Sequence, residues 1–182
     1  MLNTLTSHPV NRRNRDYSAV ISLMKSAFPE KELVPMGILR LFSLRKGASF
    51  LSFRDGDEFV GTAYIVEYED NLSVFYLTVS PRARGKGYGS MILDYVKEKG
   101  KGKNVNLDVE ALDGDAENMT ERLRRVEFYR RSGIVDTGYR LYDNGIKYMV
   151  LSSDPAAFNP RSFTRMWRYY LFGLFSEKLF RE

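Results

Sequence analysis

Residues 79–90 read VSPRARGKGYGS, and this glycine-rich segment decides how the chain folds around it. Before it, the run Leu72–Val79 is apolar enough to form a strand that is buried on both faces. After it, Gly87–Lys99 carries its apolar residues on one helical stripe. The segment is therefore a loop that leads from a central strand into an amphipathic helix. With the following strand, Val105–Glu110, it predicts a β-α-β unit.

The loop has the residue types of an anion site. Glycines at 85, 87 and 89 let the backbone approach a ligand, and the unpaired N–H groups of the first helical turn point at it. Arg84 and Lys86 add positive charge. The spacing matches neither the phosphate loop of nucleoside triphosphatases nor the dinucleotide fingerprint. These features predict a phosphate or pyrophosphate site, and the alternative is a tight glycine turn with solvated side chains.

The order of the other expected elements limits the fold class. Helices are expected over 16–28, in a short segment after Pro35, and over 87–99, 119–131 and 161–180, with Asp16 as a candidate N-cap. Strands are expected over 48–54, 58–68, 72–79, 105–110, 134–142 and 147–151. This order predicts an α/β (α+β) fold with a mixed, mostly antiparallel central sheet, a β-α-β core and helices on both faces. It excludes a doubly wound fold, in which strands and helices would alternate throughout.

Composition removes several classes of chemistry. The 182 residues include no cysteine and one histidine, His8, so a disulfide, a thiolate zinc site, a cysteine nucleophile and a histidine-dependent triad are not expected. Basic residues exceed acidic ones by 28 − 23 = 5, which favours anionic partners. Residues 1–15 lack the apolar run of a signal peptide, and Tyr169–Phe175 is too short to span a membrane. We expect a cytoplasmic protein that uses no metal.

The glycine loop resembles that of a known enzyme family. RGKGYG, residues 84–89, is similar to the Arg/Gln-x-x-Gly-x-Gly/Ala pyrophosphate loop of the GNAT superfamily of acyl-CoA-dependent N-acyltransferases, and the resemblance extends over residues 17–151. It implies a GNAT-like fold and transfer of an acetyl group from acetyl-CoA to a primary amine by direct attack in a ternary complex. The residues that it assigns to coenzyme A are Leu77, Thr78 and Val79 for the pantetheine arm, and Arg84, Gly85, Lys86, Gly87, Tyr88, Gly89 and Ser90 for the pyrophosphate.

A second segment, EFYRRSGI at residues 127–134, resembles the Phe-Tyr-x-x-x-Gly-Phe motif of the same family, with Ile134 in place of the final Phe. The resemblance implies that Tyr129 donates a proton or a hydrogen bond to the departing thiolate. A phenol with a pKa of about 10 is protonated at pH 7 and suits that role. Asn118 matches a position that binds pantetheine in the family. The alternative for Tyr129 is a core aromatic on an amphipathic helix.

The attacking amine needs a proton acceptor, because amines like that of lysine are mostly charged at pH 7. Glu110, at the C-terminal end of its strand, is the general base that we predict. Glu67 and Glu69, at the end of a hairpin strand, are the next candidates. Each of these carboxylates also suits a solvated strand end, and some members of the family use no dedicated base.

Three regions are expected along the chain: a loose N-terminal arm at 1–15, the acyl-CoA N-acyltransferase domain at 16–154, and a linker with an amphipathic helix at 155–182. That helix packs on the domain, on a partner subunit of a homodimer, or on a membrane surface, and the sequence leaves the three open. The acceptor is a small-molecule amine or a protein or peptide amine. Two other functions fit the same scaffold: a non-catalytic acyl-CoA sensor, and a basic nucleic-acid-binding module. No stacking platform or recognition helix indicates specific binding of nucleic acid.

Overall fold

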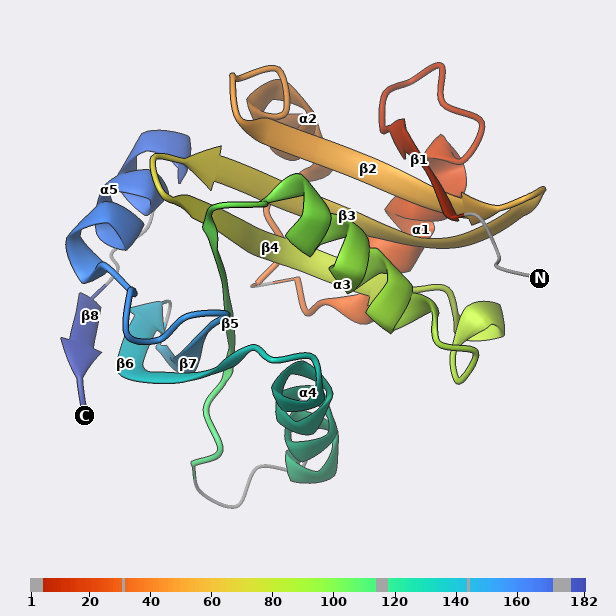
Figure 1. The fold of residues 1–182 in the computed structure, drawn as a ribbon. Coiled ribbons are helices and arrows are strands. Elements are labelled where there is room, and N and C mark those ends of the chain that lie inside the picture. The colour runs from red at the N-terminus through yellow and green to blue at the C-terminus, as the bar shows by residue number, and fades with distance from the viewer. Residues whose placement is uncertain (1–4, 31, 114–117, 144, 172–177) are drawn as a thin grey trace. The chain divides into compact units, whose positions relative to one another are not determined.

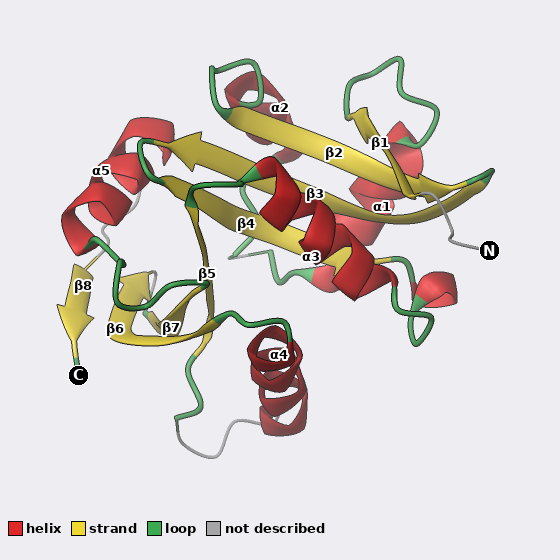
Figure 2. Cartoon of the chain, viewed as in Figure 1, coloured by secondary structure: helices red, strands yellow, loops and turns green. Residues whose placement is uncertain are grey.

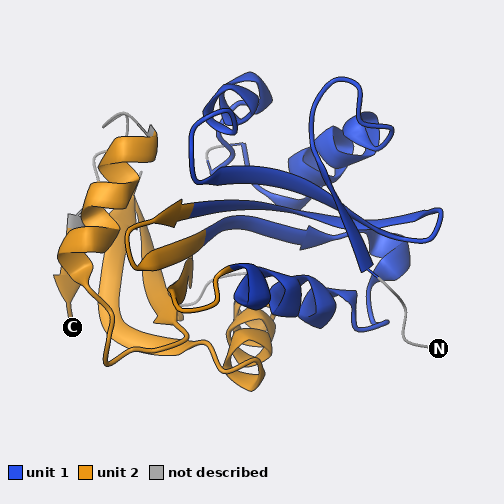
Figure 3. Ribbon diagram, turned by 45° about the horizontal axis from the view of Figure 1, so that its top comes forward, with its two compact units in different colours: residues 1–66, 74–99 blue, residues 67–73, 100–182 orange. Residues whose placement is uncertain are grey.

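The computed structural model describes residues 5–30, 32–113, 118–143, 145–171 and 178–182. The chain forms two compact units (Figure 3). Unit 1 comprises Met1–Val66 and Val74–Lys99, and unit 2 comprises Glu67–Ser73 and Gly100–Glu182. The residues on both sides of the boundary predicted between 154 and 155 belong to unit 2, and that boundary stays a prediction.

Unit 1 contains strands in the order β1-β2-β3-β4. Its elements are β1 Leu5–Pro9, α1 Tyr17–Ala27, α2 Met36–Phe42, β2 Ala48–Asp55, most of β3 Glu58–Tyr68, most of β4 Asn71–Val79, the 3-10 turn η1 Pro81–Ala83, and α3 Tyr88–Lys99. Figures 1 and 2 show α3 in front of these strands and α1 and α2 behind them. β2 pairs antiparallel with β3, and its bulge lies between Phe53 and Arg54.

The N-terminal segment corrects one expectation. We predicted a loose arm over residues 1–15, but within it Leu5–Pro9 forms β1 and pairs antiparallel with β2, with Leu5 opposite Asp55 and Pro9 opposite Leu51. This strand is short and largely polar, so its sequence has no alternation of apolar residues that would predict a strand. It forms because β2 offers an unpaired row of backbone donors and acceptors at the edge of the sheet.

Aromatic side chains pack both faces of the strands in unit 1. Phe53 lies on the side of α3, where its ring centroid is 5.2 Å from that of Tyr95. Tyr76 lies on the other side, where its ring is 5.0 Å from that of Phe28 and its hydroxyl donates to the Glu32 carbonyl at 2.8 Å. Gly61 faces α3, and a Cβ there would stand 2.6 Å from the Thr78 carbonyl oxygen. The same Cβ would stand 2.9 Å from Ile92 Cδ1 of α3, so the packing of β4 and α3 leaves no room for a side chain at position 61.

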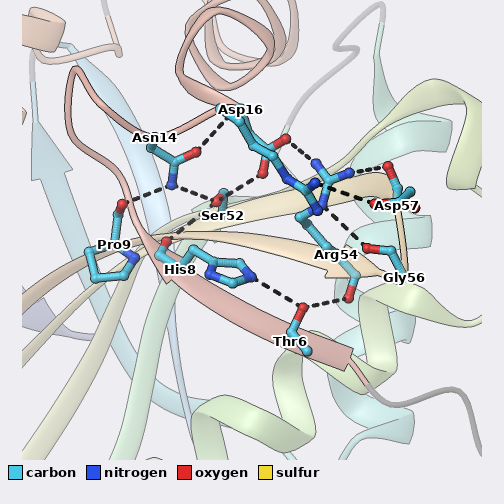
Figure 4. Close-up of polar contacts among 10 residues, drawn as sticks. Thr6, His8, Pro9, Asn14, Asp16, Ser52, Arg54, Gly56 and Asp57 are labelled. Atoms are coloured by element: carbon cyan, nitrogen blue, oxygen red, sulfur yellow. Dashed lines mark hydrogen bonds and ion pairs between the residues drawn. The ribbon is translucent and has the colours of Figure 1, made fainter.

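A buried ion pair joins the start of α1 to β2 (Figure 4). The Asp16 carboxylate, which we expected as a helix cap, makes no side-chain cap bond and instead accepts from Arg54 and Ser52. Arg54 also donates to the carbonyls of Gly56 and Asp57 in the turn between β2 and β3. Both charges are buried, and a buried pair is costly to break because the charge left behind has no partner.

Unit 2 contains strands in the order β5-β7-β6-β8. Its elements, besides the hairpin tip Glu67–Ser73, are β5 Asn104–Glu110, α4 Met119–Arg131, β6 Val135–Asp143, β7 Ile146–Ser152, α5 Pro160–Leu171 and β8 Lys178–Arg181. β5 pairs antiparallel with β7, and β6 pairs antiparallel with both β7 and β8. The pairings of both units confirm the mixed, mostly antiparallel α/β fold.

The C-terminal region corrects a second expectation. We predicted one helix over 161–180, but α5 ends at Leu171, and Lys178–Arg181 forms β8 along the edge of β6. Residues 172–177 lie outside the described residues. The apolar side of α5 is buried in the structure, through Phe163, Met166, Trp167 and Tyr170.

A chain of buried amides fastens α5 within unit 2. Asn106 donates to the Asn71 side chain at 2.7 Å, and Asn71 donates to the hydroxyl of Ser162 in the first turn of α5, also at 2.7 Å. The Asn104 side-chain oxygen accepts from Ser152 and Ser153, at the end of β7. Because unsatisfied buried polar groups are costly, these bonds fix where α5 and the hairpin tip meet.

Candidate functional site

The glycine loop lies in unit 1, between β4 and α3. Gly85 and Gly87 have φ values of +76° and +85°, a left-handed conformation that residues with a side chain rarely adopt. The amide of Met91 donates to the Gly87 carbonyl at 3.2 Å and begins the helical bonds of α3. The N–H groups of this first turn lie at the positive end of the helix.

The side chains of the loop divide into exposed cations and one buried tyrosine. Arg84, Lys86 and Ser90 are exposed. Arg84 donates through Nε to the Val79 carbonyl at 3.3 Å. Tyr88 is buried, and its hydroxyl donates to the Asp55 carboxylate at 2.6 Å. The loop thus offers a ligand its backbone and two exposed positive charges, while the side chain of Tyr88 is bound to β2.

The other predicted coenzyme residues of unit 1 lie on β4 and in the first turn of α3. Leu77 and Val79 are half-buried and point to the same face of β4, whereas Thr78 is buried on the opposite face. Gly89 is half-buried inside α3. A cavity of about 930 Å³ in the same unit is lined by residues of α1, by Asp57–Phe59 and by Ser80–Arg82, so it reaches the beginning of the loop.

Tyr129 lies in unit 2, near the end of α4. Its side chain is 8% exposed, and its ring centroid is 5.0 Å from that of Phe128. The Tyr129 carbonyl accepts from the amide of Ile134 at 2.9 Å, and Gly133 adopts a φ of +73° to end the helix. Burial raises the pKa of Tyr129 to about 12, with a smaller increase from Asp108 and a decrease from the positive charge of Arg125. The hydroxyl is therefore a proton donor at neutral pH.

Glu110 ends β5 and is held by two arginines of α4. Arg122 donates to Glu110 Oε1 at 2.8 Å, and Arg125 donates to Oε2 at 3.3 Å. Asn118 donates to the same Oε2 at 3.3 Å, and its own side-chain oxygen accepts from Arg122 at 2.8 Å. The structure thus brings two predicted residues, Glu110 and Asn118, into direct contact, and both oxygens of the predicted base accept bonds from cations.

The sequence did not identify the two arginines as partners of Glu110. Arg122, Arg125 and Tyr129 are three and four residues apart, the spacing that places side chains on one face of a helix. That spacing can be read from the sequence. The sequence does not show that the Glu110 carboxylate contacts this face of the helix. The alternative base Glu69 has a φ of +51°, and its carboxylate accepts from Ser162 and Arg165.

The described residues contain no group of three or more histidine, cysteine, aspartate or glutamate side chains that could hold a metal ion. In that same part of the chain, none of the helices is both long and apolar enough to cross a membrane.

The sequence and the fold are similar to those of acetyltransferases. The pattern of the acetyltransferase (GNAT) family matches residues 17–134. A mycothiol acetyltransferase of Thermobispora bispora is 38% identical over 96 residues, which are 50% of this chain and 32% of that protein, so the chain spans about a third of its relative.

Two solved structures have a similar fold. A putative GNAT acetyltransferase of Bacteroides thetaiotaomicron has a TM-score of 0.69 at 19% identity, over 93% of this chain and 97% of the other. An acetyltransferase of Bacillus subtilis, solved in complex with CoA, has a TM-score of 0.59 at 14% identity, over 82% of this chain and 97% of the other. The family match covers more than half of the chain, which therefore belongs to the acetyltransferase (GNAT) family.

Proposed function

We propose that this protein is an N-acetyltransferase that moves an acetyl group from acetyl-CoA to a primary amine by direct attack in a ternary complex. The observation that carries the proposal is the loop before α3, where two left-handed glycines precede the N-terminus of a helix and two exposed cations flank them. That arrangement suits the pyrophosphate of coenzyme A, and the family membership of the chain favours this ligand.

In this proposal the loop residues 84–90 hold the pyrophosphate through backbone amides, with Arg84 and Lys86 adding charge. The backbone of Leu77, Thr78 and Val79 pairs with the pantetheine arm, as the resemblance to the family implies. Asn118 is the further candidate for a pantetheine contact, although both ends of its amide are engaged by Glu110 and Arg122. Contact with pantetheine would therefore replace one of those two bonds.

The chemistry that we propose is an aminolysis of the thioester. The neutral amine attacks the carbonyl carbon, the C–N bond forms, and the C–S bond breaks with its electron pair on sulfur. Tyr129 gives its hydroxyl proton to that sulfur, for which its raised pKa of about 12 keeps it protonated. The nitrogen loses one proton, and Glu110 is the proposed acceptor. Because Glu110 accepts bonds from two arginines, taking a proton would weaken both ion pairs.

The acceptor that we propose is a primary amine on a small molecule or on a peptide. Much of the rate acceleration would come from holding the amine against the thioester, which saves the entropy of a bimolecular encounter. A screen of amines with thiol release as the signal assigns the acceptor class. An acyl-CoA sensor would bind acetyl-CoA and release no thiol with any amine.

The first test is the binding of acetyl-CoA, measured by the shift of the thermal midpoint. At 100 times its dissociation constant, acetyl-CoA should add ~2.7 kcal/mol to the free energy of unfolding. Gly87→Val should abolish the shift, because valine cannot adopt the φ of +85° without strain. Gly56→Val is the matched control, since Gly56 also has a positive φ and open space around it but lies in the β2–β3 turn.

Gly56→Val should lower the thermal midpoint and keep the response to acetyl-CoA. A folded Gly87→Val protein with unchanged affinity for acetyl-CoA would disprove the loop assignment. No response in the wild type, together with an affinity for DNA or RNA that falls steeply with salt, would favour the nucleic-acid-binding alternative.

A further inference from the structure

One face of α4 carries two arginines with different surroundings. Arg122 has a side chain that is 17% exposed, and its guanidinium donates to Glu110, to Asn118 and to the Ala111 carbonyl, each at 2.8 Å. Arg125 has a side chain that is 45% exposed, and among the described residues its only bond is the 3.3 Å contact with Glu110. Arg122 is therefore an anchor, whereas Arg125 keeps donors that are not engaged.

The position of Arg125 relates it to Tyr129 as well as to Glu110. Arg125 and Tyr129 are four residues apart on α4, so their side chains are neighbours on one face of the helix. Its guanidinium stands beside the Glu110 carboxylate at the end of β5, which limits how far the side chain can swing. Arg125 thus contacts the end of β5 and shares a face of α4 with Tyr129.

The charged groups around Tyr129 have opposite effects on the pKa of its hydroxyl. Arg125 acts from α4 and lowers the pKa of the phenol, while Asp108 acts from β5 and raises it, and burial raises it further. A phenolate forming at this place would therefore be destabilised by burial and by Asp108, and stabilised by Arg125. Glu110 reduces the effect of Arg125, because it takes one donor of the guanidinium.

We propose that Arg125 is a positioning residue that supports proton donation by Tyr129, through the positive charge that it carries on the same face of α4 as the phenol. This inference rests on the proposed function. As the C–S bond breaks, the phenol O–H bond breaks and an S–H bond forms, which leaves a negative charge on the tyrosine oxygen. The guanidinium stabilises that charge until the oxygen takes back a proton equivalent to the one that the amine has lost. Proton transfer is then complete, and the products are the amide and the free thiol.

The test is a double-mutant cycle between Arg125 and Tyr129, with the turnover of acetyl-CoA and an amine from the screen as the readout. Arg125→Gln should lower kcat about tenfold, as expected when a nearby charge shifts an acidity by about one pKa unit. The KM for acetyl-CoA should stay the same. Arg125→Lys should restore most of kcat, because it returns the positive charge. In a Tyr129→Phe background, Arg125→Gln should change kcat less than twofold, because no phenol remains to support.

Arg124→Gln is the matched control, since it removes a neighbouring exposed arginine that lies outside the three- and four-residue spacing of Arg122, Arg125 and Tyr129. It should leave kcat unchanged, and the thermal midpoints of all variants identify any loss of fold. Equal losses from Arg125→Gln in both backgrounds, or a loss no larger than that of Arg124→Gln, would overturn the inference and leave the proposed function intact. Full turnover of Tyr129→Phe would overturn both the inference and the proposed acid, and a wild type that transfers no acetyl group would overturn the proposed function itself.

Discussion

Tyr88 and Asp55 are joined by a hydrogen bond of 2.6 Å, which ties the first residue of α3 to the last residue of β2. The loop that precedes Tyr88 must hold its amides in one arrangement if it is to bind a pyrophosphate. Its own contacts with the strands are few, because Arg84, Gly85, Lys86 and Gly87 are exposed. The buried ring and bound hydroxyl of Tyr88 therefore determine where the loop ends.

Tyr88→Phe should weaken the binding of acetyl-CoA, because it removes this bond and keeps the ring. A hydrogen bond to a charged group is worth about 1.5–3 kcal/mol, and part of that loss should appear in the free energy of unfolding. Calorimetric titration with acetyl-CoA and urea unfolding measure the two effects. Tyr95→Phe is the control, because its hydroxyl accepts from Ser7 at 2.9 Å farther along α3. It should affect stability alone, and an equal effect on affinity would contradict the prediction.

Glu110→Gln should lower turnover most at low pH. There the amine is mostly protonated and the removal of its proton is hardest, so the loss should shrink as the free amine becomes dominant. The pH dependence of kcat/KM for the amine measures this. Glu127→Gln, which removes an exposed carboxylate paired with Arg130 on the outer side of α4, should leave the profile unchanged. A uniform loss across pH, with a lower free energy of unfolding, would show that Glu110 acts only as the anchor of Arg122 and Arg125.

Tyr129→Phe should change how stability depends on alkaline pH. Burial raises the pKa of Tyr129 to about 12, whereas a tyrosine in the unfolded chain has a pKa of about 10. The folded protein keeps this proton where the unfolded chain has lost it. Its contribution to the free energy of unfolding is therefore full below pH ~10 and decreases by about 2–3 kcal/mol as the pH rises to ~12.

The difference between wild type and Tyr129→Phe isolates this effect from the other titrating groups. Denaturant unfolding at several pH values between 8 and 11 should show a flatter decline of the free energy of unfolding for the variant. Tyr142→Phe, a change at an exposed tyrosine, should keep the decline of the wild type. Parallel curves for all three proteins would contradict a buried, protonated Tyr129.

Gly61→Ala should lower the free energy of unfolding by about 1–3 kcal/mol, the usual cost of overpacking. The new Cβ would stand 2.6 Å from the Thr78 carbonyl oxygen and 2.9 Å from Ile92 Cδ1, so α3 or β4 must move. Gly37→Ala is the matched control in the same unit, because nothing lies within 4 Å of its position on α2. It should raise stability by up to ~1 kcal/mol, since alanine favours a helix. Urea unfolding compares the two variants, and equal stabilities would contradict the close packing of α3.

The sequence predicts most of the elements of this fold because their signals are local. The helix 119–131 was predicted with both ends correct, since Gly133 and the apolar spacing before it are readable without tertiary contacts. β1 and β8 were missed for a common reason: each is short and forms along an edge strand, so its partner decides its conformation. In β8 the apolar residues continued a helical spacing, which favoured the wrong structure.

The candidate site follows the same distinction. The tight turn of the loop could be predicted, because a left-handed backbone favours glycine. Gly85 and Gly87 both adopt that conformation. The surroundings of Glu110 could not be predicted, because they depend on which face of α4 lies over the end of β5. Asp16 is a similar case, since its carboxylate suited a helix cap until Arg54 was brought beside it.

The hairpin tip Glu67–Ser73 interrupts unit 1 in the sequence and belongs to unit 2. No single cut of the chain can therefore separate the two units. A fragment ending at Lys99 would carry Asn71 without Asn106 and Ser162, its partners in unit 2, and would leave this buried amide without those hydrogen bonds. The same division constrains recombination between relatives. An exchange of residues 100–182 would also have to exchange the seven residues 67–73, which lie within unit 1 in the sequence. We therefore expect the two halves of the chain to be inherited together.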